Sequence, residues 1–245
     1  MEKLYIVIPA YNETDNVEEL IHDWYPIVHN IQNSILLVID DGSIDDTYTK
    51  MRKLAESRPQ LRVLTKENGG HGDTLLFGYK YAIKQGATWI FQTDSDGQTK
   101  ADEFSDFWEK RNEWDAVFGY RKVRGDGASR KFVENVLCAM LRGFFGVKVP
   151  DANCPFRLMK AEKVGLYINK LPDHYFLPNV MLTVFFAKND KVLFEEITFH
   201  DRKNGSGSID LKKIIKIGLH SVQDFLVFRR KLFNQFLFDS VPKTD

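Results

Sequence analysis

Residues 89–98 read WIFQTDSDGQ and give the clearest indication of the fold. A short apolar run ends in two carboxylates, Asp94 and Asp96, which are one residue apart. An apolar run of this length between turn-forming residues is typical of a buried parallel strand. The carboxylates then emerge at the carboxyl end of the strand, which is the edge where open α/β sheets bind ligands. We therefore expect the chemistry of the protein at this edge.

Asp94 and Asp96 can converge on one hard cation, and the amide oxygen of Gln98 can join them. Mg²⁺ or Mn²⁺ held by one or two carboxylates usually completes its shell with substrate phosphates, so the pattern indicates a phosphate-bearing ligand. The same residue types also suit an ordinary turn, because Asp bonds its own backbone and Gly accepts positive φ. The rest of the sequence has to decide between a metal site and a turn.

Three similar units precede this stretch. Each has a buried strand, a polar loop and a helix with apolar residues at helical spacing. The strands are expected at residues 4–8, 35–39 and 61–65, ahead of the strand at 89–93. Asp15 with Glu18, and Ser43 with Asp46, predict caps for the first two helices. The alternation predicts an α/β fold with a mostly parallel central sheet, right-handed crossovers and flanking helices.

The pattern changes in the second half of the chain. The sequence predicts strands at 116–119, 156–160 and 192–199, a glycine-rich loop at 124–127, a helix over 133–144 that ends at Gly146, and helices over 209–240. We expect one main domain over residues 1–208 and a C-terminal amphipathic helical extension over 209–245.

Composition narrows the classes of protein that remain. The 245 residues are 43% hydrophobic, which suits a globular domain with a sizeable core. Lys plus Arg and Asp plus Glu are both 34, so nothing indicates a nucleic-acid binder. Cys138 and Cys154 make no disulfide framework, which favours a cytoplasmic protein. No apolar run approaches a signal peptide or the ~18 to 20 residues of a membrane span. We expect a chain that is soluble or lies on a membrane surface.

The chain lacks two common phosphate-binding motifs. The first strand is not followed by G-x-G-x-x-G, which disfavours a Rossmann dehydrogenase, and G-x-x-x-x-G-K-[ST] does not occur, which disfavours a P-loop NTPase. Four other motifs each follow a strand instead: IPAYNE at 8–13, VIDDGSIDDT at 38–47, NGGHG at 68–72 and TDSDGQ at 93–98. Together they resemble the nucleotide-sugar-binding half of the family 2 glycosyltransferases, which have the GT-A fold. The resemblance covers at least residues 4–121.

This resemblance implies that Pro9, Tyr11 and Glu13 line the pocket of a nucleotide-diphosphate sugar and that Asp41 accepts a hydrogen bond from the base. A carboxylate suits the N–H of uracil or guanine, and Tyr11 offers a ring for stacking. For Asp40 and Asp41, the alternative role is to start the following helix.

The glycine-rich motif at 68–72 is implied to approach the diphosphate. Gly69, Gly70 and Gly72 would let backbone N–H groups come close to it, and His71 would donate to it. A solvated loop histidine is the alternative for His71.

By the same resemblance, Asp96 and Gln98 ligate the metal most directly, while Asp94 binds it or the ribose. The cofactor is Mg²⁺ or Mn²⁺, and its work is to neutralise charge on the leaving nucleoside diphosphate.

The second half looks like the polyprenyl-phosphate subgroup, which includes dolichyl-phosphate mannosyltransferases. The segments that carry this likeness are 119–121, Arg130, 149–151, 155–159 and 202–206. The chain departs from those relatives at Cys154-Pro155, where they commonly have Ser-Gly, so the acceptor is less defined than the donor.

Arg121, Arg130 and Arg202 are candidate clamps for donor or acceptor phosphates, because a guanidinium offers paired donors. A surface salt bridge is the alternative for each. Asp151 would be the general base if the acceptor is a sugar hydroxyl. If the acceptor is a polyprenyl phosphate, its oxygen is already anionic, and Asp151 would orient loops or Arg157. We predict a catalytic set of Asp94, Asp96, Asp151, Arg121 and Arg130.

Residues 201–245 carry nine basic and five acidic side chains. Interleaved with apolar residues, they indicate amphipathic helices that lie on an anionic membrane surface, at the inner face of the cell membrane. Packing on the domain, or on the second subunit of a homodimer, is the alternative.

The hypothesis is a metal-dependent inverting glycosyltransferase of cell-envelope polysaccharide biosynthesis that moves a sugar from a UDP- or GDP-sugar to a polyprenyl phosphate. Transfer to a glycan hydroxyl and an inactive nucleotide-sugar-binding scaffold are the alternatives.

Overall fold

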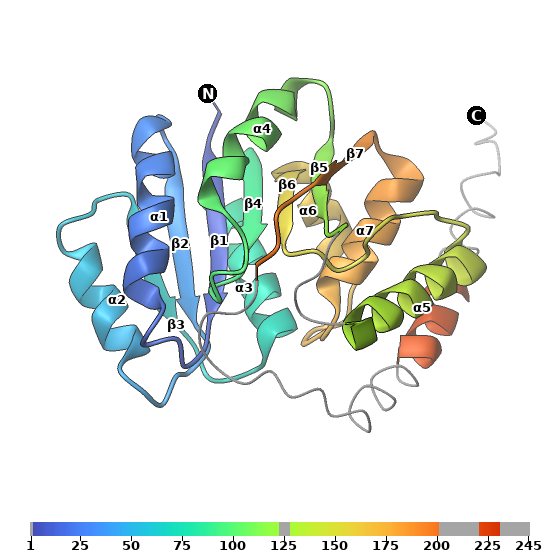
Figure 1. Ribbon diagram of the computed structural model, residues 1–245, viewed down its shortest axis with the longest axis horizontal. Coiled ribbons are helices and arrows are strands. Elements are labelled where there is room, and N and C mark those ends of the chain that lie inside the picture. Colours follow the sequence, from blue (N-terminus) through green and yellow to red (C-terminus); the bar gives the residue numbers. More distant parts are fainter. Residues whose placement is uncertain (1, 123–127, 201–220, 231–245) are drawn as a thin grey trace, which may run out of the picture.

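The computed structural model describes residues 2–122, 128–200 and 221–230 (Figure 1). Its first half is the predicted series of β-α units. The elements are β1 (Leu4–Ala10), α1 (Val17–Asn30), β2 (Ile35–Asp40), α2 (Thr47–Ala55), β3 (Leu61–Thr65), α3 (His71–Lys84) and β4 (Trp89–Thr93). All four predicted strands are present. Their pairings, β1 with β2 and β4 and β2 with β3, are parallel.

The second half extends the same sheet. Its elements are α4 (Phe104–Glu109), β5 (Ala116–Tyr120), α5 (Ala128–Phe145), β6 (Phe156–Lys160), α6 (Ala161–Ile168), α7 (Pro178–Asn189) and β7 (Val192–Glu196). The strand order is β3-β2-β1-β4-β6-β5-β7. Only β6 runs against its neighbours, β4 and β5, so the predicted mostly parallel sheet is confirmed.

Helices cover both faces of the sheet (Figure 1). Alternate residues of the buried strands point to opposite faces: Val7 and Leu37 join one core cluster with side chains of α3, α6 and α7, whereas Ile6 and Leu36 join another with side chains of α1 and α4. A sheet covered on both faces needs strands that are apolar throughout, which explains the continuous apolar runs in the sequence.

The two helix starts differ from the predicted caps. Helix α1 begins after Asn16, and α2 begins after Asp46, neither with a side-chain cap. Ser43 instead accepts the Asn12 N–H at 2.9 Å, and Asp45 accepts the Thr47 N–H at 3.0 Å. Of the residues predicted as caps, Ser43 thus joins the loop after β1, because the loops after β1 and β2 meet at one edge of the sheet.

Helices α6 and α7 were not predicted. Residues 178–186 of α7 are all buried, so the helix lacks the polar face by which an amphipathic helix is recognised. Among the described residues of the C-terminal extension, 221–230 are helical, and Phe225 packs against Phe144 and Phe145 of α5. The boundary at 208 and the rest of the extension lie outside the described residues. No helix in the described ranges has the length and apolar character to cross a membrane.

Candidate active site

A cleft of about 370 Å³ opens at the carboxyl edge of the sheet, where the loops after β1, β2, β3 and β4 meet. It brings together many of the predicted donor-site residues. The lining residues are Pro9, Ala10, Tyr11, Glu13, Asp41, Asn68, Gly70, His71, Thr74, Asp94, Ser95 and Asp96. The Tyr11 side chain is exposed, as a stacking platform would be, whereas Glu13 is buried.

Asp94 lies at the end of β4 beside His71, with 3.6 Å between its Oδ1 and the histidine Nε2. Gln92 Nε2 donates to the same carboxylate at 3.1 Å. Burial raises the pKa of Asp94, and the charges of His71 and Arg121 act against that rise. A cation in the cleft would stabilise the ionised carboxylate further.

Asp96 and Gln98 complete the loop after β4. Asp96 Oδ1 accepts the Gln98 backbone N–H at 3.2 Å, and Gln98 Nε2 donates to the His200 carbonyl at 2.9 Å. A cation would use the other end of this amide, its oxygen. Within the described residues, no three His, Cys, Asp or Glu side chains form a cluster able to hold a metal. Asp94 and Asp96 line the cleft, and their oxygens fit a Mg²⁺ or Mn²⁺ ion that arrives with the oxygens of a diphosphate, whereas Gln98 is buried and is not among the lining residues.

Asp41 binds the glycine-rich loop. Its Oδ1 accepts Lys66 Nζ at 2.6 Å and the Gly69 N–H at 3.0 Å, and its Oδ2 accepts the Gly70 N–H at 2.8 Å. Burial acts to raise the pKa of Asp41, but the hydrogen bonds from Lys66 and Gly69 leave it lower than usual. Two of the N–H groups expected to face the diphosphate therefore hold the loop against this carboxylate.

The glycines of this loop serve different needs. A Cβ on Gly69 would collide with the Asp73 carboxylate, and one on Gly72 would collide with the carbonyls of Tyr175 and Phe176. Gly70 has open space around it and a φ of 85°. Gly69 and Gly72 thus allow close packing of the chain, and Gly70 is the one beside the open cleft.

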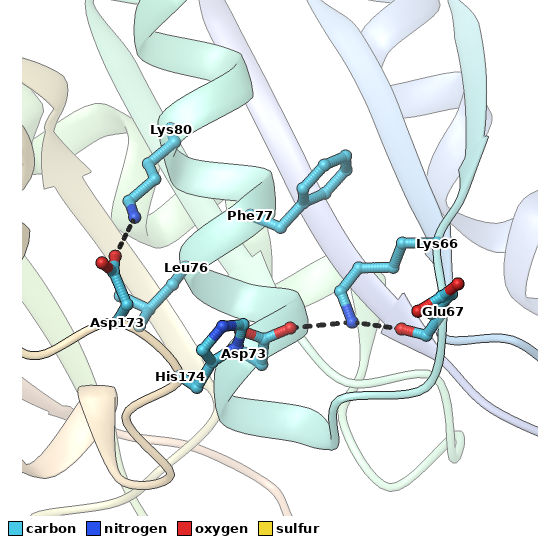
Figure 2. A pocket seen from close by; sticks show the side chains of 8 residues that line it. All are labelled: Lys66, Glu67, Asp73, Leu76, Phe77, Lys80, Asp173 and His174. Carbon is cyan, nitrogen blue, oxygen red and sulfur yellow. Dashed lines mark hydrogen bonds and ion pairs between the residues drawn. The ribbon is translucent and has the colours of Figure 1, made fainter.

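A second cleft, of about 400 Å³, lies on the other side of Lys66 (Figure 2). Asp73 binds Lys66 at 2.9 Å and His174 at 2.7 Å, while Lys80 pairs with Asp173 at 3.1 Å. Lys66 therefore bridges Asp41 of the first cleft and Asp73 of the second. Sequence reasoning missed Lys66, although it directly follows β3, where the other motifs follow their strands.

Arg121 and Asp151 form a buried, two-pronged ion pair. Arg121 Nε and Nη2 donate to the two Asp151 oxygens at 2.7 and 2.9 Å. The Arg121 guanidinium also lies over the ring of Phe199, 5.0 Å from its centre. Burial acts to raise the pKa of Asp151, but the hydrogen bond and charge of Arg121 leave it lower than usual.

The remaining predicted residues lie nearby or outside the described ranges. Arg130 is half-buried in the first turns of α5, and Arg202 lies outside the described residues. Arg157 is fully buried and donates to the carbonyls of Cys154, Asn179 and Ala152 at 2.7 to 2.9 Å. Sequence reasoning also missed Glu134, which lies 3.7 Å from Arg121. Its helix was predicted, but nothing local distinguishes it from a solvated glutamate.

The profile of the glycosyl transferase family 2 matches residues 5–165. The chain belongs to this family. The match spans every strand from β1 to β6 and all the loops that line the first cleft.

Several curated relatives carry a lipid phosphate in their names. The chain is 28% identical over 211 residues to the undecaprenyl-phosphate 4-deoxy-4-formamido-L-arabinose transferase of Klebsiella pneumoniae, covering 83% of this chain but only 63% of that protein. It is 23% identical over 247 residues to the dolichyl-phosphate beta-glucosyltransferase ALG5C of Trichomonas vaginalis, covering 93% of this chain and 72% of that protein.

Among solved structures, the fold resembles glucosyl-3-phosphoglycerate synthase from Mycobacterium tuberculosis in complex with Mn²⁺ and UDP-glucose. The TM-score is 0.67 at 19% identity, over 93% of this chain and 79% of that one. This likeness confirms the predicted GT-A fold of the family 2 chain.

Proposed function

We propose that this chain is an inverting, metal-dependent glycosyltransferase that moves a sugar from a UDP- or GDP-sugar to a polyprenyl phosphate. Two kinds of support bear on the acceptor. Curated relatives are named as undecaprenyl- and dolichyl-phosphate transferases. The second support is the state of Asp151, the carboxylate that a hydroxyl acceptor would need as its base.

Asp151 is poorly suited to take a proton. Both of its oxygens accept from Arg121, and its pKa is held below the usual range. A general base works best with a pKa near the working pH, which for a carboxylate means a raised value. An acceptor phosphate needs no base, because its attacking oxygen is already anionic. The ion pair is therefore the single observation that carries the choice of a phosphate acceptor.

Asp41 supports a donor with a keto base. Its carboxylate lines the cleft, and Lys66, 2.6 Å away, helps to keep it ionised, so it can only accept a hydrogen bond. The N3–H of uracil and the N1–H of guanine can donate to a carboxylate, whereas the corresponding ring nitrogens of cytosine and adenine are acceptors. Asp41 thus favours a UDP- or GDP-sugar and disfavours the amino bases.

Asp94 and Asp96 would hold Mg²⁺ or Mn²⁺, which when bound neutralises charge on the leaving diphosphate. The chain's own residues hold the reactants. His71 lies at the cleft beside Asp94 and would donate to the diphosphate, and the walls of the cleft orient the sugar. The acceptor oxygen attacks the anomeric carbon opposite the leaving group, so one displacement inverts that carbon. Positioning and electrostatics supply most of the rate enhancement.

Helix α5 and residues 221–230 would bring the enzyme to the lipid. Phe132 is 68% exposed and lies one turn from the exposed Val136 on α5. Leu226 and Val227 are also exposed, on the adjacent helical segment. Exposed cations lie on the same two segments: Lys131, Arg142, Arg229 and Arg230. Apolar side chains among cations suit the surface of an anionic bilayer, where a polyprenyl phosphate presents its head group.

The direct test is a screen of the purified chain with UDP- and GDP-sugars, Mn²⁺ and short-chain polyprenyl phosphates, with glycolipid detected by mass spectrometry. We expect a sugar–phosphate–prenyl product from a uridine or guanosine donor. Parallel reactions with prenyl alcohols and oligosaccharides supply hydroxyl acceptors. Transfer to these hydroxyls but not to the phosphates would overturn the proposed acceptor. Donor binding without transfer to either class would favour the scaffold.

A further inference from the structure

Glu134 connects α5 to the Arg121–Asp151 ion pair. Its Oε1 accepts the Ala152 backbone N–H at 2.7 Å and the Cys138 thiol at 3.4 Å, and its Oε2 lies 3.7 Å from Arg121 Nη2. Three elements distant in the sequence therefore meet at one carboxylate: α5, the end of β5 and the loop before β6.

Ala152 is the centre of this connection. Its N–H is held by Glu134, and its carbonyl accepts Arg157 Nη2 and Thr183 Oγ1, each at 2.9 Å. Asp151, the preceding residue, is held by Arg121. Glu134 thus fixes the side of the loop that faces α5, whereas Arg157 and α7 fix the other side. Loss of the Glu134 acceptor would leave the Ala152 N–H without this partner and free the loop from α5.

The charge of Glu134 is set by several neighbours. Asp151 faces it from the loop and Arg121 from the end of β5. Cys138 lies one turn later on α5, and Arg130 lies one turn earlier. Burial and the Asp151 charge raise the pKa of Glu134, and the Ala152 N–H and Arg121 act in the opposite direction. Two carboxylates beside one guanidinium favour a proton on the more weakly paired of them, which is Glu134.

We propose that Glu134 is a positioning residue for the acceptor, which holds the loop at Ala152 and, through its proton, sets how much negative charge an acceptor phosphate meets beside Arg121. This inference rests on the proposed phosphate acceptor. Below the pKa of Glu134 the carboxyl is neutral, and it gains one negative charge as the pH rises through that value. The added charge repels a phosphate, so acceptor KM rises with pH while donor affinity does not.

The test compares Glu134→Gln with the wild-type enzyme across pH 5 to 9, using farnesyl phosphate as acceptor. Gln keeps an oxygen for the Ala152 N–H but cannot ionise. The acceptor KM of the wild-type enzyme is divided by that of the variant at each pH. Because both proteins use the same acceptor, this ratio removes the effect of the titration of farnesyl phosphate itself. We expect a ratio near one where Glu134 is protonated and about fivefold weaker wild-type affinity where it is ionised, because one additional negative charge repels the phosphate through partly screened protein. The exposed Glu162→Gln on α6 is the matched control, with a ratio near one throughout.

The outcomes separate the two proposals. A wild-type enzyme that neither binds nor glycosylates farnesyl phosphate overturns the acceptor assignment and the Glu134 role with it. If the enzyme glycosylates farnesyl phosphate but the ratio of wild-type to Glu134→Gln acceptor KM does not change with pH, only the Glu134 role is overturned. A substitution that changes kcat or the affinity for Mn²⁺–UDP and leaves acceptor KM unchanged would also contradict that role.

Amide hydrogen exchange tests the positioning separately. Glu134→Ala should speed exchange at residues 151–154 and raise acceptor KM about tenfold, since a buried N–H loses its partner. Glu134→Gln should restore protection of these amides. Unchanged exchange in a folded Glu134→Ala variant would contradict a positioning role.

Discussion

The proposed donor and acceptor sides of the site hold their charges in different ways. On the donor side, Asp94 and Asp96 follow β4 on a loop that lines an open cleft. On the acceptor side, Asp151 and Arg121 neutralise each other in a buried pair before any ligand arrives. The first arrangement can receive a cation and a diphosphate. The second is a fixed pair, and under the proposed function the acceptor supplies its own nucleophilic charge.

Burial determines which of these carboxylates can exchange partners. Good geometry and additional hydrogen bonds offset the desolvation cost of a buried ion pair, so neither partner is easily released for proton transfer. Partly exposed carboxylates on a loop lose less when they exchange water for a metal. On this account, donor-side substitutions act on catalysis, and acceptor-side substitutions act on stability and acceptor affinity.

The largest effect is expected from Asp96→Ala on the donor side. Removal of a predicted metal ligand should lower transfer by about 10³-fold, because a Lewis-acid metal supplies several kcal/mol to the transition state. Steady-state assays across Mn²⁺ concentrations measure the loss, and circular dichroism checks the fold. Asp102→Ala, at an exposed position shortly after β4, is the control and should leave turnover unchanged. A full rate in Asp96→Ala would remove the metal assignment.

Lys66→Met should have a smaller effect that is specific to the nucleotide. Its ammonium group binds both Asp41 and Asp73, so its loss leaves two carboxylates without this cation. We expect the affinity for Mn²⁺–UDP or Mn²⁺–GDP to fall about tenfold, since a hydrogen bond to a charged group contributes about 1.5 to 3 kcal/mol. The affinity for Mn²⁺–CDP should fall less, so that the ratio of the two affinities decreases. Calorimetry with the three nucleotides measures this. Lys80→Met, which removes an exposed pair in the second cleft, is the control. Equal losses for all three nucleotides would indicate a loop effect in place of base recognition.

Substitutions on the proposed membrane surface should act weakly and only where lipid is present. Phe132→Ser together with Leu226→Ser should lower flotation with vesicles of anionic lipid about threefold to tenfold, because less apolar area enters the bilayer. Leu166→Ser removes an exposed apolar side chain from α6 and serves as the control. Transfer to a water-soluble short-chain acceptor should stay unchanged. Flotation equal to that of the wild type would contradict this surface.

The sequence predicted the strands and loops around the first cleft well and the packing around Arg121 poorly. Strands β1 to β4 and the polar loops after them could be read in chain order, because each motif lies within a few residues of its strand. The contacts of Asp41 with Lys66 and Gly70 join different loops, so their geometry could not be predicted. The cluster of Arg121, Glu134 and Asp151 depends on where α5 packs, and no local pattern encodes that. Helix α7 was missed because burial on all sides removes the periodic signal.

Under the proposed function, Asp151 is a partner of Arg121 and the acceptor supplies its own anion. The most direct measurement is the rate of transfer to farnesyl phosphate by Asp151→Asn, at saturating donor and acceptor and at a temperature where the variant is folded. We predict a kcat within about tenfold of the wild-type value, with a lower free energy of unfolding, because a buried pair is broken. A fall in kcat of about 10² to 10⁴-fold, the range for loss of a general base, would contradict it.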